Sequence, residues 1–217
     1  MPKVKIPRKS TTIDMTAMCD VAFLLLSFFI LATKQKPPEV LAVNTPSSVS
    51  SKAVPDKSII ITLTKEGRVF LMLGDETKKT DILNNINSTR ALGLSATEIA
   101  KWNKNEFIGL PLNQIKGSLA LSSPISADKL PGIPTIDSTN NEMIDWMRSI
   151  TNVYAGGDQT KLEQMILVKG DNAALYPAFK SIKEAFKKAD IYKFRIVTNG
   201  ETPPPGSELA NSPKTTN

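Results

Sequence analysis

The sequence contains no histidine and only one cysteine, and these two shortages exclude several kinds of chemistry. A chain with one Cys cannot form an intramolecular disulfide, and zinc sites built from Cys and His lack the ligands they need. Ser-His, Cys-His and His-relay catalysis are excluded for the same reason. No nucleophile elbow, Gly-rich phosphate loop or H-E-x-x-H motif occurs either. We therefore expect a non-enzymatic protein without a cofactor or a metal site; a Ser-Lys pair is the one hydrolytic arrangement left open.

Aromatic residues are also scarce, at 6% of the chain, and the basic charge is concentrated at one end. The formal net charge is +6, and Lys3, Lys5, Arg8 and Lys9 contribute four positive charges before residue 10. Nucleic-acid binding requires clustered Lys and Arg together with stacking aromatics. Because the lysines of residues 34–217 are dispersed, we expect no nucleic-acid partner.

The long apolar run at residues 15–33 predicts a transmembrane helix. Its roughly 19 residues span about 28 Å, which is one bilayer crossing. The cations before it place residues 1–14 in the cytoplasm and the residues after the helix on the far side of the membrane. Membrane lipid is therefore an expected partner. A cleaved signal peptide is the competing interpretation. The poor cleavage site at Ala32-Thr33-Lys34 and the Asp within the run favour an uncleaved anchor, in which Cys19 has a packing role.

Asp20 is the unusual residue of this run. It lies about 7 to 8 Å inside the hydrocarbon boundary, which is too deep for a short carboxylate to reach water by snorkelling. Placing an Asp there costs about 2.5 to 3.5 kcal/mol. A hydroxyl residue forms helix-helix hydrogen bonds without that cost, so the carboxylate indicates a function in proton transfer.

Two hydroxyl residues share the helix face of Asp20. Thr16 and Ser27 lie four residues before it and seven after it, within about 40° of it around the helix axis. The stripe is expected to face protein partners or a narrow aqueous path. For Thr16 and Ser27, helix-helix hydrogen bonding and support of a proton path stay equally open. Asp14, just before the run, is expected to cap the N-terminus of the helix.

Residues 13–21, Ile-Asp-Met-Thr-Ala-Met-Cys-Asp-Val, resemble the motif that opens the transmembrane helix of the ExbD/TolR family. The family pattern is roughly Ile-Asn-x-Thr-Pro-x-x-Asp-Val, so Asp14 and Ala17 depart from it, whereas Thr16, Asp20 and Val21 match. The segments 165–171 and 194–198 are similar to the end of the family's periplasmic domain.

The resemblance implies an inner-membrane motor subunit with a cytoplasmic N-terminus and a periplasmic C-terminal domain. Asp20 would be the proton carrier. Proton flow would be coupled to TonB-dependent outer-membrane transport or to Tol-type envelope maintenance. The implied partners are an ExbB/TolQ-like oligomeric channel enclosing a homodimer, and a TonB-like or TolA-like periplasmic protein. A signal-anchored periplasmic binding or scaffold protein without a proton role is the alternative.

Beyond the anchor, the pattern predicts an α+β domain with a small mixed sheet. A Pro- and Ser-rich linker covers residues 34–57, with a short strand possible at 39–43. The expected sheet combines a hairpin with two further strands, and a helix at 175–186 backs it; the four strands are expected at 58–64, 68–73, 165–169 and 193–198.

An insert at about 80–160 reads as several helices inside the domain at 58–200. Ser95 and Glu98 predict a capping box for a helix at 96–106, and apolar spacing predicts another at 140–153. Three aromatic side chains are expected to pack the insert onto the sheet, with a docking face as the alternative: Trp102, Phe107 and Trp146. The Pro-rich segment 201–217 is expected to be a disordered tail.

Overall fold

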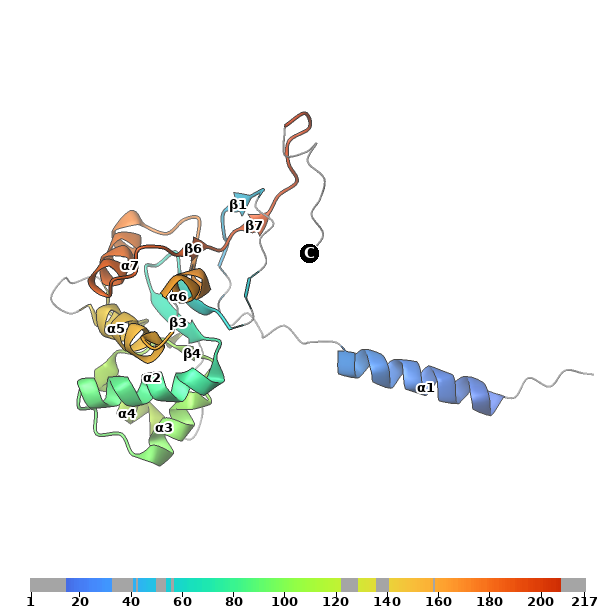
Figure 1. Cartoon of the computed structure of the whole chain (residues 1–217), viewed down its shortest axis with the longest axis horizontal. Helices are drawn as coiled ribbons and strands as arrows, with labels where there is room; N and C mark the ends of the chain where they lie inside the picture. The colour runs from blue at the N-terminus through green and yellow to red at the C-terminus, as the bar shows by residue number, and fades with distance from the viewer. Residues whose placement is uncertain are drawn as a thin grey trace, which may run out of the picture. The chain divides into compact units, whose positions relative to one another are not determined.

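The computed structural model of the chain describes residues 15–32, 41, 43–49, 54–55, 57–121, 129–135, 141–157 and 159–207. The chain divides into two compact units, residues 1–39 and 40–217. The first contains the helix α1, Met15–Ala32, and the second contains the remaining helices and all described strands (Figure 1). This arrangement confirms the expected fold class, one N-terminal apolar helix followed by a mixed α and β domain.

A five-stranded mixed sheet forms the centre of the second unit, in the order β4-β3-β2-β5-β6. β2 and β3 form the predicted antiparallel hairpin, and Gly67 in its turn has φ +81°, which favours glycine. β5 pairs parallel with β2, and β6 pairs parallel with β5. The strands are β2 Ile59–Leu63, β3 Val69–Leu73, β4 Phe107–Ile108, β5 Ile166–Gly170 and β6 Arg195–Ile196.

Six helices are described in the second unit, and those predicted from apolar spacing are present. The helix expected at 96–106 ends earlier, at Asn103, and both hydrogen bonds of the Ser95–Glu98 capping box are formed. The helix bounds are α2 Glu76–Thr89, α3 Ala96–Asn103, α4 Leu112–Leu119, α5 Glu142–Tyr154, α6 Gln159–Met165 and α7 Tyr176–Lys188.

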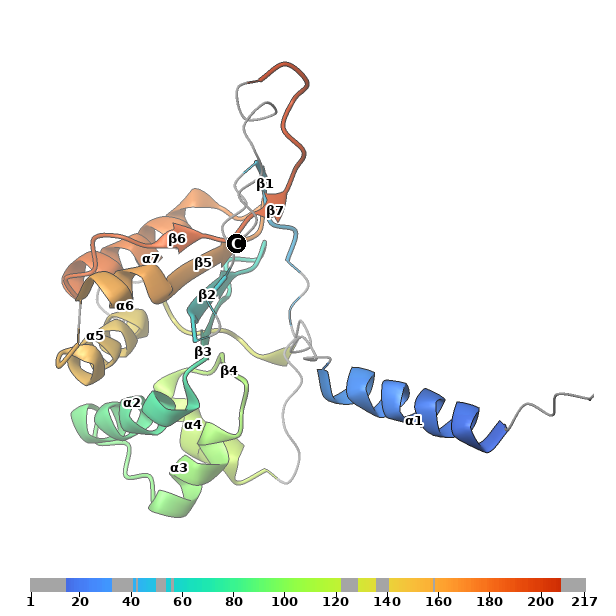
Figure 2. The same cartoon turned by 45° about the vertical axis from the view of Figure 1, so that its right-hand side comes forward.

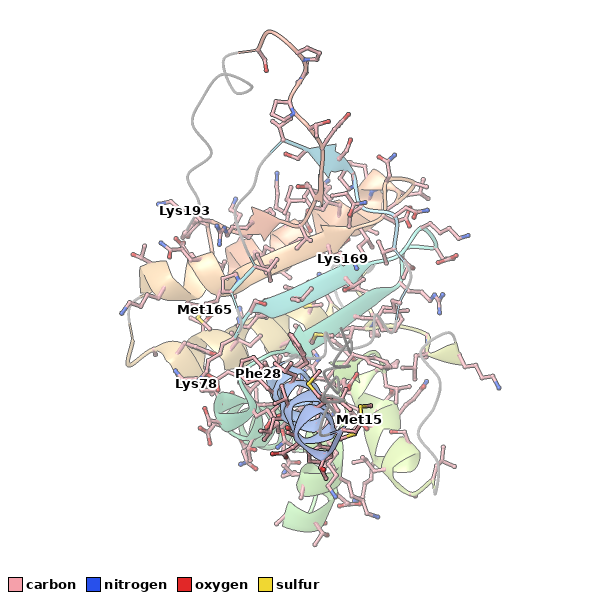
Figure 3. All side chains as sticks on the ribbon, turned by 90° about the vertical axis from the view of Figure 1, so that its right-hand side faces the viewer. Met15, Phe28, Lys78, Met165, Lys169 and Lys193 are labelled. Carbon is pink, nitrogen blue, oxygen red and sulfur yellow. The ribbon has the colours of Figure 1, made fainter. Side chains whose placement is uncertain are left out.

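The main core lies between the sheet and the helices α5 and α7, which cover one of its faces (Figure 2). Alternate residues of β2 point into this core, so that Ile59, Ile61 and Leu63 are buried. Ile182 and Phe186 meet them from the apolar side of α7. Figure 3 looks onto the opposite face of the sheet, where Lys169 of β5 is labelled.

Of the three aromatic residues expected to pack the insert onto the sheet, Phe107 contacts the Phe70 ring of β3, whereas the two tryptophans contact each other inside the insert. Trp102 of α3 and Trp146 of α5 are buried, and their rings meet edge to face with centroids 5.6 Å apart. Phe107 lies in β4, which pairs antiparallel with β3. The sequence did not predict that the insert adds this strand to the sheet.

The linker also contributes a strand, but not at the expected place. Residues 39, 40 and 42 lie outside the described residues, and neither Leu41 nor Val43 is in a strand. Instead β1, Ser47–Ser48, pairs parallel with β7, Asn199–Gly200. Glu201, the first residue of the expected tail, donates its backbone N–H to the Ser48 carbonyl at 2.9 Å. Residues 208–217 lie outside the described residues, so the expectation of disorder there stays a prediction.

Candidate functional site

The helix α1 is a membrane-length apolar helix with one charged residue. Its 18 residues are about 27 Å long, and none of them is buried within the structure. The sole charged side chain is that of Asp20, which is exposed. By length and composition α1 fits a single bilayer crossing.

Asp20, Thr16 and Ser27 lie on one face of α1, as their spacing predicted. The rise of the helix places Thr16 about 6 Å and Ser27 about 10 Å from Asp20 along the axis. The Ser27 hydroxyl donates to the Leu24 carbonyl of the same helix at 2.9 Å. Because this bond satisfies the Ser27 donor locally, Ser27 can lie among apolar surroundings without a partner from another helix.

The chemistry available at this site is the binding and release of one proton. A carboxylate provides acceptor oxygens when ionised and an O–H donor when protonated. Among the described residues, no three His, Cys, Asp or Glu side chains gather in a way that would hold a metal ion. Asp14 lies outside the described residues, so its expected capping role stays a prediction.

The comparison with protein families identifies the chain. The family model for the biopolymer transport protein ExbD/TolR matches residues 7–201. The chain belongs to the ExbD/TolR family. The match includes α1, the insert and the whole sheet, and it confirms the resemblance seen at residues 13–21 and 165–198. No curated protein and no solved structure matches the chain.

Membership of the ExbD/TolR family implies a role in biopolymer transport as a transducer of the proton-motive force. The family is anchored in the inner membrane, and α1 provides the apolar helix for such an anchor in this chain. The family consists of transport and transducer proteins rather than enzymes.

In this ExbD/TolR chain the segment that follows the anchor is tied to the C-terminal half of the domain. The Asp171 carboxylate accepts a hydrogen bond from the Asn44 backbone N–H at 3.2 Å. The Asn172 N–H in turn donates to the Asn44 carbonyl at 2.8 Å. Asp171 belongs to the segment 165–171 that resembled the family, but only the structure reveals its link to Asn44.

Lys79 is a buried cation that joins the first turn of α2 to the end of α3. Its ammonium group donates to the carbonyls of Asn103 and Asn105, at 2.7 and 2.6 Å. These carbonyls lie where α3 ends, so the positive charge also complements the negative end of the helix dipole. Burial lowers the pKa of Lys79, and the nearby Glu76 and Glu106 oppose this shift.

Glu142 is a buried carboxylate that joins the first turns of two helices. It is the first residue of α5, and it accepts the backbone N–H of Leu112 in the first turn of α4 at 2.8 Å. Burial raises the pKa of Glu142, against the opposing effects of this hydrogen bond and of Arg90. No local pattern marks Lys79 or Glu142 in the sequence, because their partners lie 24 to 30 residues away.

Proposed function

We propose that this chain is the proton-carrying subunit of an inner-membrane motor and that Asp20 is the proton carrier. The observation that carries the proposal is the single carboxylate within an otherwise uncharged, membrane-length helix of a proton-motive-force transducer family. Charged residues inside membrane segments are costly, and they mark ion or proton pathways.

The energetics of a carboxylate at this depth suit a coupling device. In apolar surroundings the neutral acid is favoured, whereas contact with water or a cation favours the ionised form. Movement of the helix between two such environments therefore requires uptake and release of a proton. Each proton that crosses the membrane potential releases about 2.3 kcal/mol per 100 mV, which a conformational or rotary step can use.

One helix cannot enclose a proton path, so the proposal includes partners. We place α1 inside an ExbB/TolQ-like oligomeric channel, as one helix of a homodimer, with residues 1–14 in the cytoplasm and the second unit in the periplasm. The stripe of Thr16, Asp20 and Ser27 faces the channel protein. A TonB-like or TolA-like protein receives the output at the periplasmic domain, for outer-membrane transport or for envelope maintenance.

Replacement of Asp20 by Asn tests the proposal, because Asn keeps the shape and hydrogen bonding but does not titrate. We expect energy-dependent uptake through the outer membrane, or envelope integrity in a Tol-type system, to fall to background while the complex purifies at normal yield. The activity of Asp20→Glu should be intermediate, since Glu also binds and releases a proton but its carboxylate lies about one methylene farther from the helix. Ser27→Ala is the matched control on the same stripe and should weaken activity less.

A fully active Asp20→Asn variant would refute the proton-carrier role. The anchored binding or scaffold protein would then be the better description of the chain. Loss of the complex itself in Asp20→Asn would instead show that the carboxylate is a structural contact between helices, and this too contradicts the proposal.

A further inference from the structure

The helix α7 has a stripe of lysines that the proposed function does not use. The stripe contains one tyrosine and three lysines at spacings of four, three and four residues: Tyr176, Lys180, Lys183 and Lys187. At about 100° per residue they lie within about 60° of one another around the helix. All four side chains are exposed. Repeated cations on one line of a helix form a continuous positive strip rather than a scattered charge.

The same part of the domain is rich in exposed apolar side chains. Seven large hydrophobic or tyrosine side chains are exposed in the described part of the second unit, and four of them belong to residues 175–196. The four are Leu175 (68% exposed), Tyr176 (66%), Tyr192 (67%) and Ile196 (54%). Exposed apolar groups in the same segment as a row of exposed cations are typical of an interaction surface.

Ring contacts place the lysine stripe next to β6. Phe179 and Phe186 of α7 contact Phe194, which directly precedes β6, with centroid distances of 6.3 and 5.1 Å. Phe179 is about 40° from Lys183 around the helix, so the stripe borders the side of α7 that meets β6. Figures 1 and 2 show α7 and β6 side by side. The α7 strip is defined here as Leu175, Tyr176, Lys180, Lys183, Lys187, Tyr192 and Ile196.

Acidic groups near the α7 strip only partly neutralise it. Glu184 pairs with Lys180 at 4.0 Å, and both side chains are largely exposed, so the pair is weak. Asp190 accepts the Tyr192 hydroxyl at 3.2 Å, and Glu163 accepts the Tyr192 backbone N–H at 3.3 Å. Residues 176–196 contain six cations and two acids, which leaves a net charge of +4.

We infer that the α7 strip docks on anionic lipid headgroups of the membrane that holds α1. Lysine stems lie along an apolar surface while the ammonium groups reach phosphates, and tyrosines favour the headgroup region. Lysines near an anionic surface contribute additively, and salt screens their contribution.

The short connection to α1 limits how far the second unit can move from a bilayer that holds the anchor. Only residues 33–40 separate the end of α1 from Leu41, the first described residue of the second unit. Eight extended residues span at most about 29 Å, so the lipid surface is present at high effective concentration. This tether favours lipid over a diffusing acidic protein as the occupant. The inference requires only that α1 is inserted, and it does not depend on the proton role of Asp20.

The test uses the full chain, reconstituted in vesicles with Cys19 replaced by Ser and a fluorophore on one introduced cysteine. Leu175→Cys reports on the α7 strip, and Leu121→Cys, at an exposed leucine of the insert, is the control site. Quenching by a nitroxide-headgroup lipid is compared in phosphatidylcholine vesicles and in vesicles with about 30% phosphatidylglycerol. In vesicles with phosphatidylglycerol, we expect quenching of the label at residue 175 and none at residue 121. In phosphatidylcholine vesicles we expect quenching at neither site. The quenching at residue 175 should disappear at about 1 M salt, where the Debye length is about 3 Å.

Two triple variants distinguish binding through the α7 strip from a general effect of the positive net charge. Changing Lys180, Lys183 and Lys187 to Gln should lower the ratio of docked to undocked protein on the order of 100-fold. The control variant has the same charge change at three exposed lysines of the insert, Lys101, Lys104 and Lys116, and should leave quenching unchanged.

Three results would overturn the inference. The first is equal quenching at residue 175 with and without phosphatidylglycerol. The second is an equal effect of the two triple variants, which would indicate net charge alone. The third is a label at residue 175 that is shielded from solvent to the same extent in both kinds of vesicle, which would indicate that a protein, such as a second copy of the chain, covers the strip. Since all six lysines are exposed, normal thermal unfolding of both variants is expected and confirms that they are folded.

Discussion

Replacing Lys79 by Met tests how the end of α3 is held against α2. Lys79 is only 5% exposed, and its ammonium group donates to two carbonyls at the end of α3. Methionine keeps an unbranched apolar stem of similar length, so the packing of the stem is largely retained. The substitution therefore isolates the two hydrogen bonds and the charge.

Two opposing terms set the expected magnitude. Each hydrogen bond from a charged donor contributes about 1.5 to 3 kcal/mol, and its loss leaves a carbonyl without this partner. Part of that loss is offset because the buried ammonium no longer has to be desolvated, the same effect that lowers the pKa of Lys79. We expect a net loss of about 2 to 4 kcal/mol in the free energy of unfolding. For a domain of this size that lowers Tm by roughly 5 to 15 °C.

Thermal unfolding of the full chain in detergent, followed by circular dichroism, measures this loss. Amide hydrogen exchange over residues 96–108 then shows whether the loosening is local to α3 and β4. Lys101→Met, on the exposed side of α3, is the control and should change stability by no more than about 0.5 kcal/mol. If Lys79→Met were as stable as this control, the proposed stabilisation of the α2–α3 contact by Lys79 would be wrong.

Two further substitutions test the buried carboxylate and a close backbone contact. Because burial raises the pKa of Glu142 above its ordinary value of 4.5, the folded state holds this proton more tightly than the unfolded state. The stability of the wild type relative to Glu142→Gln should therefore fall as the pH rises from about 4 to about 7, and a constant difference in Tm would contradict the assignment. Gly109→Ala would place its Cβ closer than van der Waals contact to the edge of the Phe70 ring, and we expect a loss of about 1 to 3 kcal/mol in the free energy of urea unfolding. Gly117→Ala, in α4 with open space around it, should instead stabilise by about 0.5 to 1 kcal/mol; equal effects of the two glycine variants would refute the contact.

The elements that the sequence predicted are those whose signal is contained in a few neighbouring residues. Apolar spacing near 3.6 residues marked α5 and α7, and the β-branched runs on either side of Gly67 marked the hairpin. The Ser95–Glu98 capping box needed only four residues to be recognised. Asp20 could be selected for a related reason, since one carboxylate within a long apolar run is visible without any tertiary information.

The features that the sequence missed depend on partners far along the chain. β1, β4 and β7 contain two residues each, too few to show a period of two, and only pairing with a distant strand defines them. In the sequence Asp171 looks like an ordinary acidic loop residue, because the backbone N–H that donates to it belongs to Asn44, 127 residues away. These contacts also join the parts of the domain, since β1 and Asn44 connect the linker to the C-terminal half, β4 attaches the insert to the sheet, and Lys79 joins α2 to the end of α3. Local patterns therefore specify the helices and the central hairpin, whereas the attachment of the linker and the insert arises only when the chain folds as a whole.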